Sequence, residues 1–329
     1  MIERLFFIPI VAFVGIVLGL LLKGVDRILA ARMQARVGPP LLQPFTDLKK
    51  LMMKENIVPK NAVAWLFNLM PFVALVSAVA ILLYLPLFGF PPLLEGHGDL
   101  ILIVYLFTFP ALAMVIGGFA SASPYATIGA QREMATMVGY EFPLAIAVVS
   151  IAWLVSISNP AVSAFSLSAI ASIPVWGLVG PIGLVGIALL FIVIMTVMPG
   201  ELGKLPFDAA EAETEIAGGI LAEYSGRNLA LFYLADAVKA VAMGSLVVAL
   251  FLPWNIAETF GLLGINAILA DAIFFVAKLF AVLFVGMTFS RVAFARLRIT
   301  QIVKFYWGYA TLIALLGLLL ISLELIFFV

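Results

Sequence analysis

The chain is built from long apolar stretches separated by shorter polar segments. Each stretch is close to the roughly 20 residues that a helix needs to cross a hydrocarbon layer about 30 Å thick. Because backbone groups cannot hydrogen-bond to lipid, and these runs do not alternate as barrel strands do, each stretch is expected to be a helix. The pattern predicts an all-α integral membrane protein, a single membrane domain over residues 1–329. Its eight predicted transmembrane helices lie near residues 5–22, 63–85, 100–119, 138–157, 175–198, 229–252, 268–289 and 303–328.

The segments that connect these stretches alternate in basic content. The first, third, fifth and seventh connections carry lysine or arginine, whereas the segments near 86–99, 158–174 and 253–267 carry neither. The positive-inside rule therefore predicts that the basic connections face the cytoplasm and that both termini lie outside the cell membrane. Trp176 and Trp254 fall at the expected outer boundary, where aromatic anchors are common.

The composition fits a chain whose solvent is lipid. Hydrophobic residues make up 65% of the sequence and charged residues 11%, against about 25% charged residues in soluble domains. The 18 basic and 18 acidic residues cancel, so the net charge gives no reason to expect a nucleic-acid partner. With no cysteine and one histidine, His97, the chain lacks the usual ligand sets of haem, iron–sulfur and zinc sites. We therefore expect no metal or cofactor in this chain and assign any electron chemistry to partner subunits.

The first basic connection, residues 23–62, is long enough to hold structure of its own. Arg32 and Arg36 continue one face of the first helix, and Gly38-Pro39-Pro40 then ends that helix. An amphipathic cytoplasmic helix is expected over residues 47–54. This helix either rests on lipid headgroups or forms a docking collar for a cytoplasmic partner. The collar interpretation assigns the partner contacts to Arg32, Arg36, Lys49 and Lys50.

The connection over residues 199–227 is acidic on the side where basic residues are the norm. Asp208 and Glu211 have the spacing of a helix cap followed by a capping-box glutamate, with Gly226 as the expected helix end. Glu211, Glu215 and Glu223 would share one face of that helix. Such a row beside apolar helices would have raised pKa values and could exchange protons near neutral pH. The acidic residues of this loop are Glu201, Asp208, Glu211, Glu213, Glu215 and Glu223.

Charged residues also interrupt the predicted spans. A charge at the centre of a membrane helix costs about 2.5–3.5 kcal/mol, so it normally has a partner or serves a pathway. Asp236 and Lys239 are three residues apart and could pair with one another, and Asp271 could meet headgroups. Glu141 and Lys278 have no partner nearby in the sequence, which favours a functional role for them.

Several motifs together resemble a known family. The segment Gly200-Glu201-Leu202-Gly203-Lys204-Leu205-Pro206-Phe207-Asp208 and the acids that follow it are similar to the signature loop of the eight-helix membrane-anchor (H-type) subunit shared by respiratory complex I and energy-converting membrane-bound hydrogenases. Arg36-Val37-Gly38-Pro39-Pro40, Gln43-Pro44 and Asp47 also match, as do Gly139-Tyr140-Glu141-Phe142-Pro143-Leu144 and, near the end, Arg298 and Gln301. The motifs occur in the family's order over nearly the whole chain.

The resemblance implies an anchor and coupling subunit without a catalytic centre of its own. Leu41-Leu42 stands where quinone-reducing members usually carry Asn-Arg-Val-Gly-Pro, and Lys239 is not typical of complex I. Both departures favour the branch of ferredoxin-fed hydrogenases and related sulfane reductases. The implied partners are peripheral hydrogenase-like large and small subunits, an iron–sulfur subunit, antiporter-like membrane subunits and lipid, with iron–sulfur clusters and, in a hydrogenase, nickel–iron in the partners.

The resemblance also implies two sets of site residues. The proton or charge relay would comprise Glu141, Glu201, Asp208, Glu211, Glu213, Glu215, Glu223, Asp236, Lys239 and Lys278. Partner docking would involve Arg27, Arg32, Arg36, Gln43, Asp47, Lys49, Lys50 and Arg298.

Other functions remain open from the sequence. A quinone-site subunit of an NADH:quinone oxidoreductase would share the same motifs. A stand-alone secondary transporter would also bury charges, but such proteins usually show internal repeats, which this sequence lacks. A purely structural anchor would have the docking segment without needing Glu141 or Lys278.

Overall fold

A computed structural model describes residues 6–96, 98–159, 163, 165–261 and 263–327 of the protein. His97 lies outside these described residues, so the structure says nothing of the single histidine. Within the described part the chain is helical, without a β-strand, and eight of its helices are long and apolar enough to cross a membrane. The structure thus confirms the predicted all-α membrane fold.

The spanning helices follow the apolar stretches, and several extend beyond them. The first six are α2 (Ile8–Met33), α4 (Ala64–Tyr84), α5 (Asp99–Ala120), α6 (Pro124–Ser158), α8 (Pro181–Glu201) and α10 (Gly226–Phe251). The seventh is α12 (Ile265–Leu283), continued by η4 (Phe284–Phe289) and α13 (Ser290–Ala293); the eighth comprises α14 (Ile299–Lys304), η5 (Phe305–Ala310) and α15 (Thr311–Phe327). Because α2 and α6 run past the apolar runs that predicted them, both carry charged residues on their added turns.

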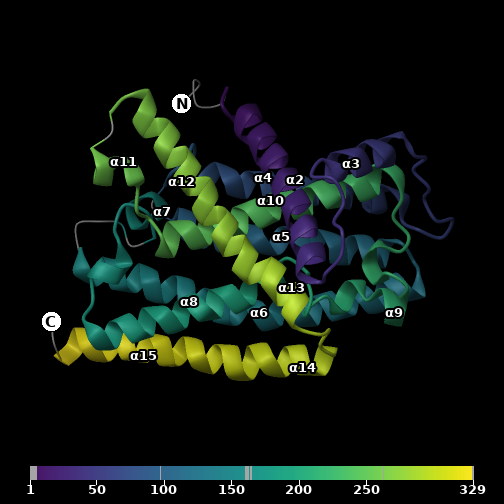
Figure 1. Ribbon diagram of the computed structural model, residues 1–329. Coiled ribbons are helices and arrows are strands. Elements are labelled where there is room, and N and C mark those ends of the chain that lie inside the picture. The colour runs from purple at the N-terminus through teal and green to yellow at the C-terminus, as the bar shows by residue number, and fades with distance from the viewer. Residues whose placement is uncertain (1–5, 97, 160–162, 164, 262, 328–329) are drawn as a thin grey trace.

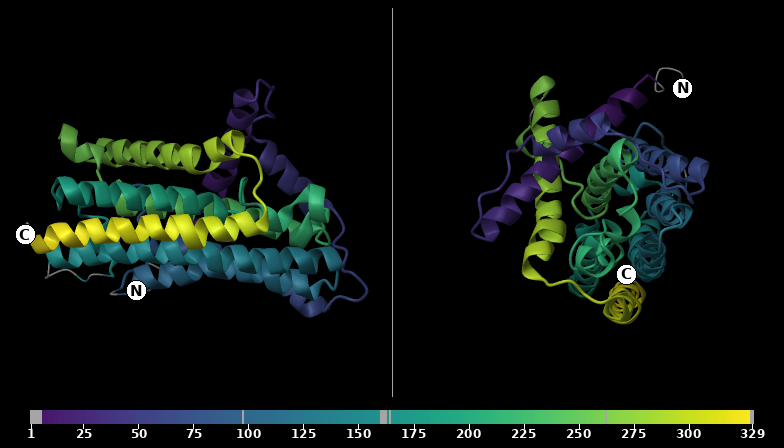
Figure 2. Two further views of the ribbon diagram at one scale, coloured as in Figure 1. Left: turned by 90° about the horizontal axis from the view of Figure 1, so that it is seen from below. Right: turned by 90° about the vertical axis from the view of Figure 1, so that its right-hand side faces the viewer.

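The helices form a bundle with two tilted members. Viewed along the bundle, at the right of Figure 2, α6, α8 and α15 are seen end-on, whereas α2 and α12 are seen lengthwise. The α10 helix is the most deeply buried span and packs against α2, α4 and α12. A polar side chain on α10 can therefore meet partners from several different helices.

Short elements cap the two ends of the bundle. Toward the right of Figure 1 lie α3 (Gln43–Met53) and the acidic loop with α9 (Glu213–Ile216). Toward the left lie α7 (Leu167–Ile170) and α11 (Ile256–Phe260). The connections that carry α3 and α9 are basic-bearing and those that carry α7 and α11 lack lysine and arginine, so the ends differ as the sequence predicts. Which end faces the cytoplasm stays a prediction.

Candidate functional site

A cavity of about 660 Å³ lies where α2, α3 and α10 meet the acidic loop. Apolar residues such as Leu20, Met114 and Phe232 form part of its wall. Charged side chains of both signs form the rest, and a charged lining inside a membrane bundle is costly unless it is paired or functional. The charged lining residues are Lys23, Asp26, Arg27, Asp47, Lys50, Lys54, Glu133, Glu201, Lys204, Asp208, Glu211, Asp236, Lys239 and Arg291.

Asp236 and Lys239 both face this cavity, but they do not pair with one another. Lys23 Nζ lies 2.7 Å and Lys204 Nζ 2.9 Å from Asp236 Oδ2. Lys239 Nζ lies instead 2.6 Å from Glu201 Oε1. The predicted Asp236–Lys239 pair is therefore wrong. The reason is that α10 is central, so residues three apart on it face different neighbours and find closer partners in other segments.

Lys204 introduces the acidic loop and shows how strongly these charges interact. Burial lowers the pKa of its ammonium group, but the negative charges of Asp236 and Glu211 outweigh this effect. The pKa of Lys204 is consequently raised above its usual value, and the ammonium group stays charged at neutral pH. Lys204 therefore fixes the start of the acidic loop on α10.

The acidic loop is not the single helix that its sequence pattern predicts. It consists of η2 (Ala209–Glu211), α9 and η3 (Gly219–Leu221), interrupted by left-handed backbone. Ala217, Gly218 and Gly219 have φ values of 51°, 92° and 54°. At Gly219 an added Cβ would collide with the carbonyl oxygen of Ala210, so the close approach requires glycine. The predicted common face of Glu211, Glu215 and Glu223 is therefore wrong, and Gly226 begins α10 instead of ending a helix.

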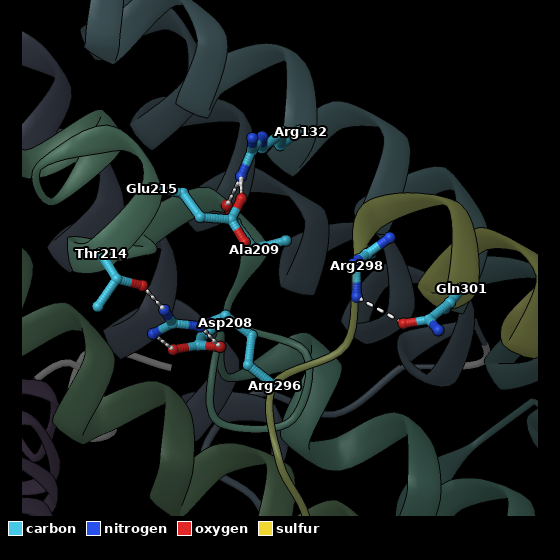
Figure 3. Close-up of polar contacts among 8 residues, drawn as sticks. All are labelled: Arg132, Asp208, Ala209, Thr214, Glu215, Arg296, Arg298 and Gln301. Carbon is cyan, nitrogen blue, oxygen red and sulfur yellow. Dashed lines mark hydrogen bonds and ion pairs between the residues drawn. The ribbon is translucent and has the colours of Figure 1, made fainter.

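Two arginines from other segments hold this loop instead (Figure 3). Asp208, predicted as a helix cap, makes no side-chain cap; Arg296 Nε and Nη2 donate to its two oxygens at 2.8 and 2.6 Å. Arg296 also donates to Thr214 Oγ1 at 3.1 Å. Arg132 of α6 lies 2.6 Å from Glu215 Oε2. These two acids are thus committed to fastening the loop.

Within the acidic loop, Glu211 lies between the two arginine-bound acids, Asp208 and Glu215. It turns toward the cavity. It is half-buried, and within the described residues it has no ion pair. Burial raises the pKa of its carboxyl group, only partly opposed by Lys204. Glu213 is exposed and Glu223 is partly buried, and neither lines the cavity. Of these three acids, only Glu211 presents a titratable carboxyl group to the cavity.

Two further carboxylates lie on α6, one of which sequence reasoning missed. Glu133 is buried and lines the cavity, yet it falls before the apolar run at 138–157 and was assigned to a connection. Pro124, at the first turn of α6, was the signal that the helix begins earlier. Glu141 does not line the cavity; its Oε1 is buried without a hydrogen-bond partner in the described part of the chain. Asp26 was also missed, because it lies on the part of α2 beyond the apolar run that predicted this helix. Its carboxylate pairs with Arg291 at 3.0 Å.

Lys278 and Asp271 lie away from the cavity. Lys278 Nζ donates to the carbonyl oxygens of Leu252 and Trp254, at 2.8 and 2.7 Å. It therefore caps the end of α10 and is not brought together with the other predicted relay residues. Asp271 Oδ1 accepts a 2.9 Å hydrogen bond from the backbone N–H of Ala257.

The predicted docking residues divide into an internal cluster and an exposed set. Asp47 accepts hydrogen bonds from Arg27 at 2.8 Å and Gln43 at 2.7 Å, which fastens α3 to α2. The remaining five are exposed: Arg32, Arg36, Lys49, Lys50 and Arg298. Arg298 begins α14, where its backbone N–H donates to Gln301 Oε1 at 2.9 Å (Figure 3).

The Arg27–Asp47 contact predicts a pH dependence for α3. The hydrogen bond from Arg27 lowers the pKa of Asp47 below its usual value, so the contact stabilises α3 above that usual pKa and is lost as the pH falls through the lowered one. For a half-exposed pair the effect is at most about 1 kcal/mol. The protection of the α3 amides against hydrogen exchange, measured relative to the intrinsic rate at each pH, should therefore fall below about pH 4. Asp47→Asn should show this reduced protection already at neutral pH, and unchanged protection in that variant would contradict the assignment.

Comparison with known proteins places this site in a family. Residues 6–322 match the family described as NADH dehydrogenase. Two relatives, from Bacillus cereus (strain B4264) and Bacillus thuringiensis (strain Al Hakam), are named as the H-type subunit of NADH-quinone oxidoreductase. Each is 33% identical over 321 residues, covering 93% of this chain and 90% of its own. A solved chain of the membrane-bound sulfane sulfur reductase, described as an archaeal respiratory membrane complex, superimposes with a TM-score of 0.78 at 27% identity, over 98% of this chain and 99% of that one.

These similarities extend along nearly the full length of the chain and include its eight spanning helices. The relatives are subunits of multi-subunit respiratory complexes of the cell membrane. The chain therefore belongs to the NADH dehydrogenase family, as an H-type membrane subunit of a complex-I-like oxidoreductase.

Proposed function

We propose that this chain anchors and couples a ferredoxin-dependent, ion-translocating oxidoreductase, either a membrane-bound hydrogenase or a sulfane reductase. In this proposal it docks a peripheral redox arm that carries iron–sulfur clusters, and it passes protons or charge to antiporter-like membrane subunits. The observation that carries the proposal is the cavity itself, which reaches from the docking segment and the acidic loop to charged residues on α6, α8 and α10.

The docking role rests on the surface of the segment between α2 and α4. Val37 is 98% and Met53 79% exposed, although both lie outside the spanning helices. They stand beside the exposed Arg32, Arg36 and Lys49. Apolar and basic side chains together on such a surface are typical of a protein interface. We place this face in the cytoplasm, with both termini outside, as the basic connections predict.

The relay role rests on carboxyl groups that have no ion pair with a basic residue in the described part of the chain. Glu211 and Glu133 face the cavity, and Glu141 lies farther along α6. Glu133 and Glu141 are eight residues apart, which corresponds to about 12 Å along a helix. A proton therefore needs intermediate carriers, such as internal water, to pass between them. Unpaired acids inside a membrane bundle are costly, and proton transfer is the function that such residues commonly serve.

A quinone-reducing complex is the second candidate. The relatives from Bacillus are named as subunits of NADH-quinone oxidoreductase, and the mixed polar and apolar wall of the cavity suits a quinone headgroup and the start of its tail. Against this, Leu41 and Leu42 replace the element usual in quinone-reducing members. The purified complex discriminates between the two candidates, because reduction of an added quinone would favour this one and nickel in the metal analysis would favour the hydrogenase.

Isolation of the complex through a tag on this chain tests the docking role. We expect the wild type to co-purify with peripheral subunits that carry iron. Replacing Arg32, Arg36, Lys49 and Lys50 by glutamate should release the peripheral arm, because charge reversal at an interface disfavours association. The helical circular dichroism of the membrane part should not change. A peripheral arm that still co-purifies at normal stoichiometry would show that these four residues do not hold it.

A further inference from the structure

The acids around the cavity fall into two classes. Five of those that line it have a basic partner: Asp26, Asp47, Glu201, Asp208 and Asp236. Glu133 and Glu211 line it without an ion pair in the described part of the chain, and Glu141, whose Oε1 atom is buried, does not line it. Glu201 differs from the other paired acids because its ion pair with Lys239 is the most completely buried of those five.

We propose that Glu201 and Lys239 form a fixed ion pair beside the proton path, which keeps both charges while Glu133 and Glu141 exchange protons. This inference rests on the proposed relay function and narrows it. Glu201 and Lys239 therefore leave the set of relay residues that the sequence motifs suggest, and they have a positioning role instead.

The geometry holds both charges in place. Lys239 Nζ lies 2.6 Å from Glu201 Oε1 and also donates to the backbone carbonyl of Glu201 at 2.7 Å. The side chains are 4% and 1% exposed. In a medium of low dielectric constant the attraction between the two charges is strong. Protonating Glu201 would leave the Lys239 ammonium group buried without its counter-charge, which is strongly unfavourable.

The pair lines the cavity and lies within electrostatic range of Glu141. Glu201 and Lys239 line the cavity together with Glu133, whereas Glu141 does not. Both Glu133 and Glu141 lie within electrostatic range of the two charges. Tyr140, next to Glu141 in the chain, has a buried hydroxyl group that lies beside the Glu201 carboxyl without a well-formed hydrogen bond in the described residues. An internal water at this hydroxyl would offer protons a way past the pair.

The Glu201–Lys239 pair limits the net negative charge that the buried acids around it can carry. Because the Glu201–Lys239 pair is neutral as a unit, ionised Glu133 and Glu141 leave at most two uncompensated negative charges. Without Lys239 there would be three buried carboxylates that repel one another, so the lysine sets how many protons the group retains. The other ionisable groups facing it are Tyr140 and Tyr306, whose rings pack edge to face, and Glu211 and Lys204 of the acidic loop.

The decisive variant removes both charges. In sealed vesicles, with reduced ferredoxin as donor, we expect Glu201→Gln/Lys239→Gln to keep the ratio of ions pumped to electrons transferred within about twofold of wild type. Glu133→Gln, which removes an exchanging carboxyl, should lower that ratio by about fivefold or more, the lower end of typical coupling between sites. A loss in the double variant as large as that of Glu133→Gln would overturn the inference.

Two further variants separate the alternatives. Glu201→Asp keeps the charge and shortens the side chain, so a fixed pair predicts a nearly normal ratio, whereas a fivefold loss would mean that protons pass through the Glu201 carboxyl. Each single glutamine variant should assemble in lower yield than the double, because it leaves one buried charge unpaired; equal yields would contradict the pairing. If Glu133→Gln and the double variant both pump normally, the relay function itself fails, and the inference with it.

Discussion

Replacing Glu141 by glutamine is expected to uncouple the complex without dismantling it. Glutamine keeps the shape and hydrogen-bonding capacity of glutamate but cannot exchange a proton. Because the Oε1 atom of Glu141 has no hydrogen-bond partner in the described part of the chain, its loss as a charged group should leave packing intact. Electron transfer from ferredoxin should remain substantial, and the number of ions pumped per electron in sealed vesicles should fall by about fivefold or more.

Glu213→Gln is the matched control for this prediction. Glu213 is exposed in α9, whereas the Oε1 atom of Glu141 is buried, so the Glu213 variant should pump normally. Equal losses in both variants would mean that burial within the bundle does not select the relay residues. Unchanged pumping in Glu141→Gln would show that Glu141 has only a structural role. Loss of assembly would show that its charge holds a partner subunit.

The fold was predictable because lipid imposes a strong constraint on sequence. A spanning helix must be apolar over nearly its whole length, so each of the eight candidate spans in the described residues is visible as a predominantly apolar run. The helix ends are less visible, because turns beyond the hydrocarbon layer can carry any polar residue without penalty. Glu133 and Asp26 are buried on helical turns that lie outside the apolar runs, and for this reason the apolar pattern assigned them to connections.

The partners of the charged residues were not predictable in the same way. Helical periodicity relates residues three or four apart, whereas Arg132 and Glu215 pair across 83 residues and Lys23 and Asp236 across 213. The acidic loop shows the same limit. Its acids have helical spacing, but the extended backbone at Ala212 separates Glu211 from the short helix that carries Glu215. The left-handed backbone from Ala217 to Gly219 then ends that helix before Glu223. Motif order identified the family, and tertiary contacts decided which acids of the loop face the cavity.

The largest loss of stability is expected for Asp236→Asn. Asp236 is the shared counter-charge of Lys23 on α2 and Lys204 at the start of the acidic loop. Removing one partner of a buried ion pair typically costs about 3–5 kcal/mol, and the partial exposure of these side chains places the expected loss near 3 kcal/mol. The midpoint of thermal dissociation of the detergent-solubilised complex should fall accordingly. Asp236→Glu, which keeps the charge, should lose much less, and equal losses would indicate a packing effect.

Glu211 should partly compensate for the loss of the negative charge of Asp236. Burial and the charge of Asp236 raise the pKa of Glu211, whereas Lys204 and Lys23 lower it. When Asp236 becomes neutral, one raising influence disappears, so Glu211 should ionise more readily and take over as counter-charge for the two lysines. Asp236→Asn/Glu211→Gln should therefore be less stable than the sum of the two single losses, because neighbouring charges are coupled. Strict additivity would mean that Glu211 does not interact with these lysines and that the cavity holds two independent charge centres.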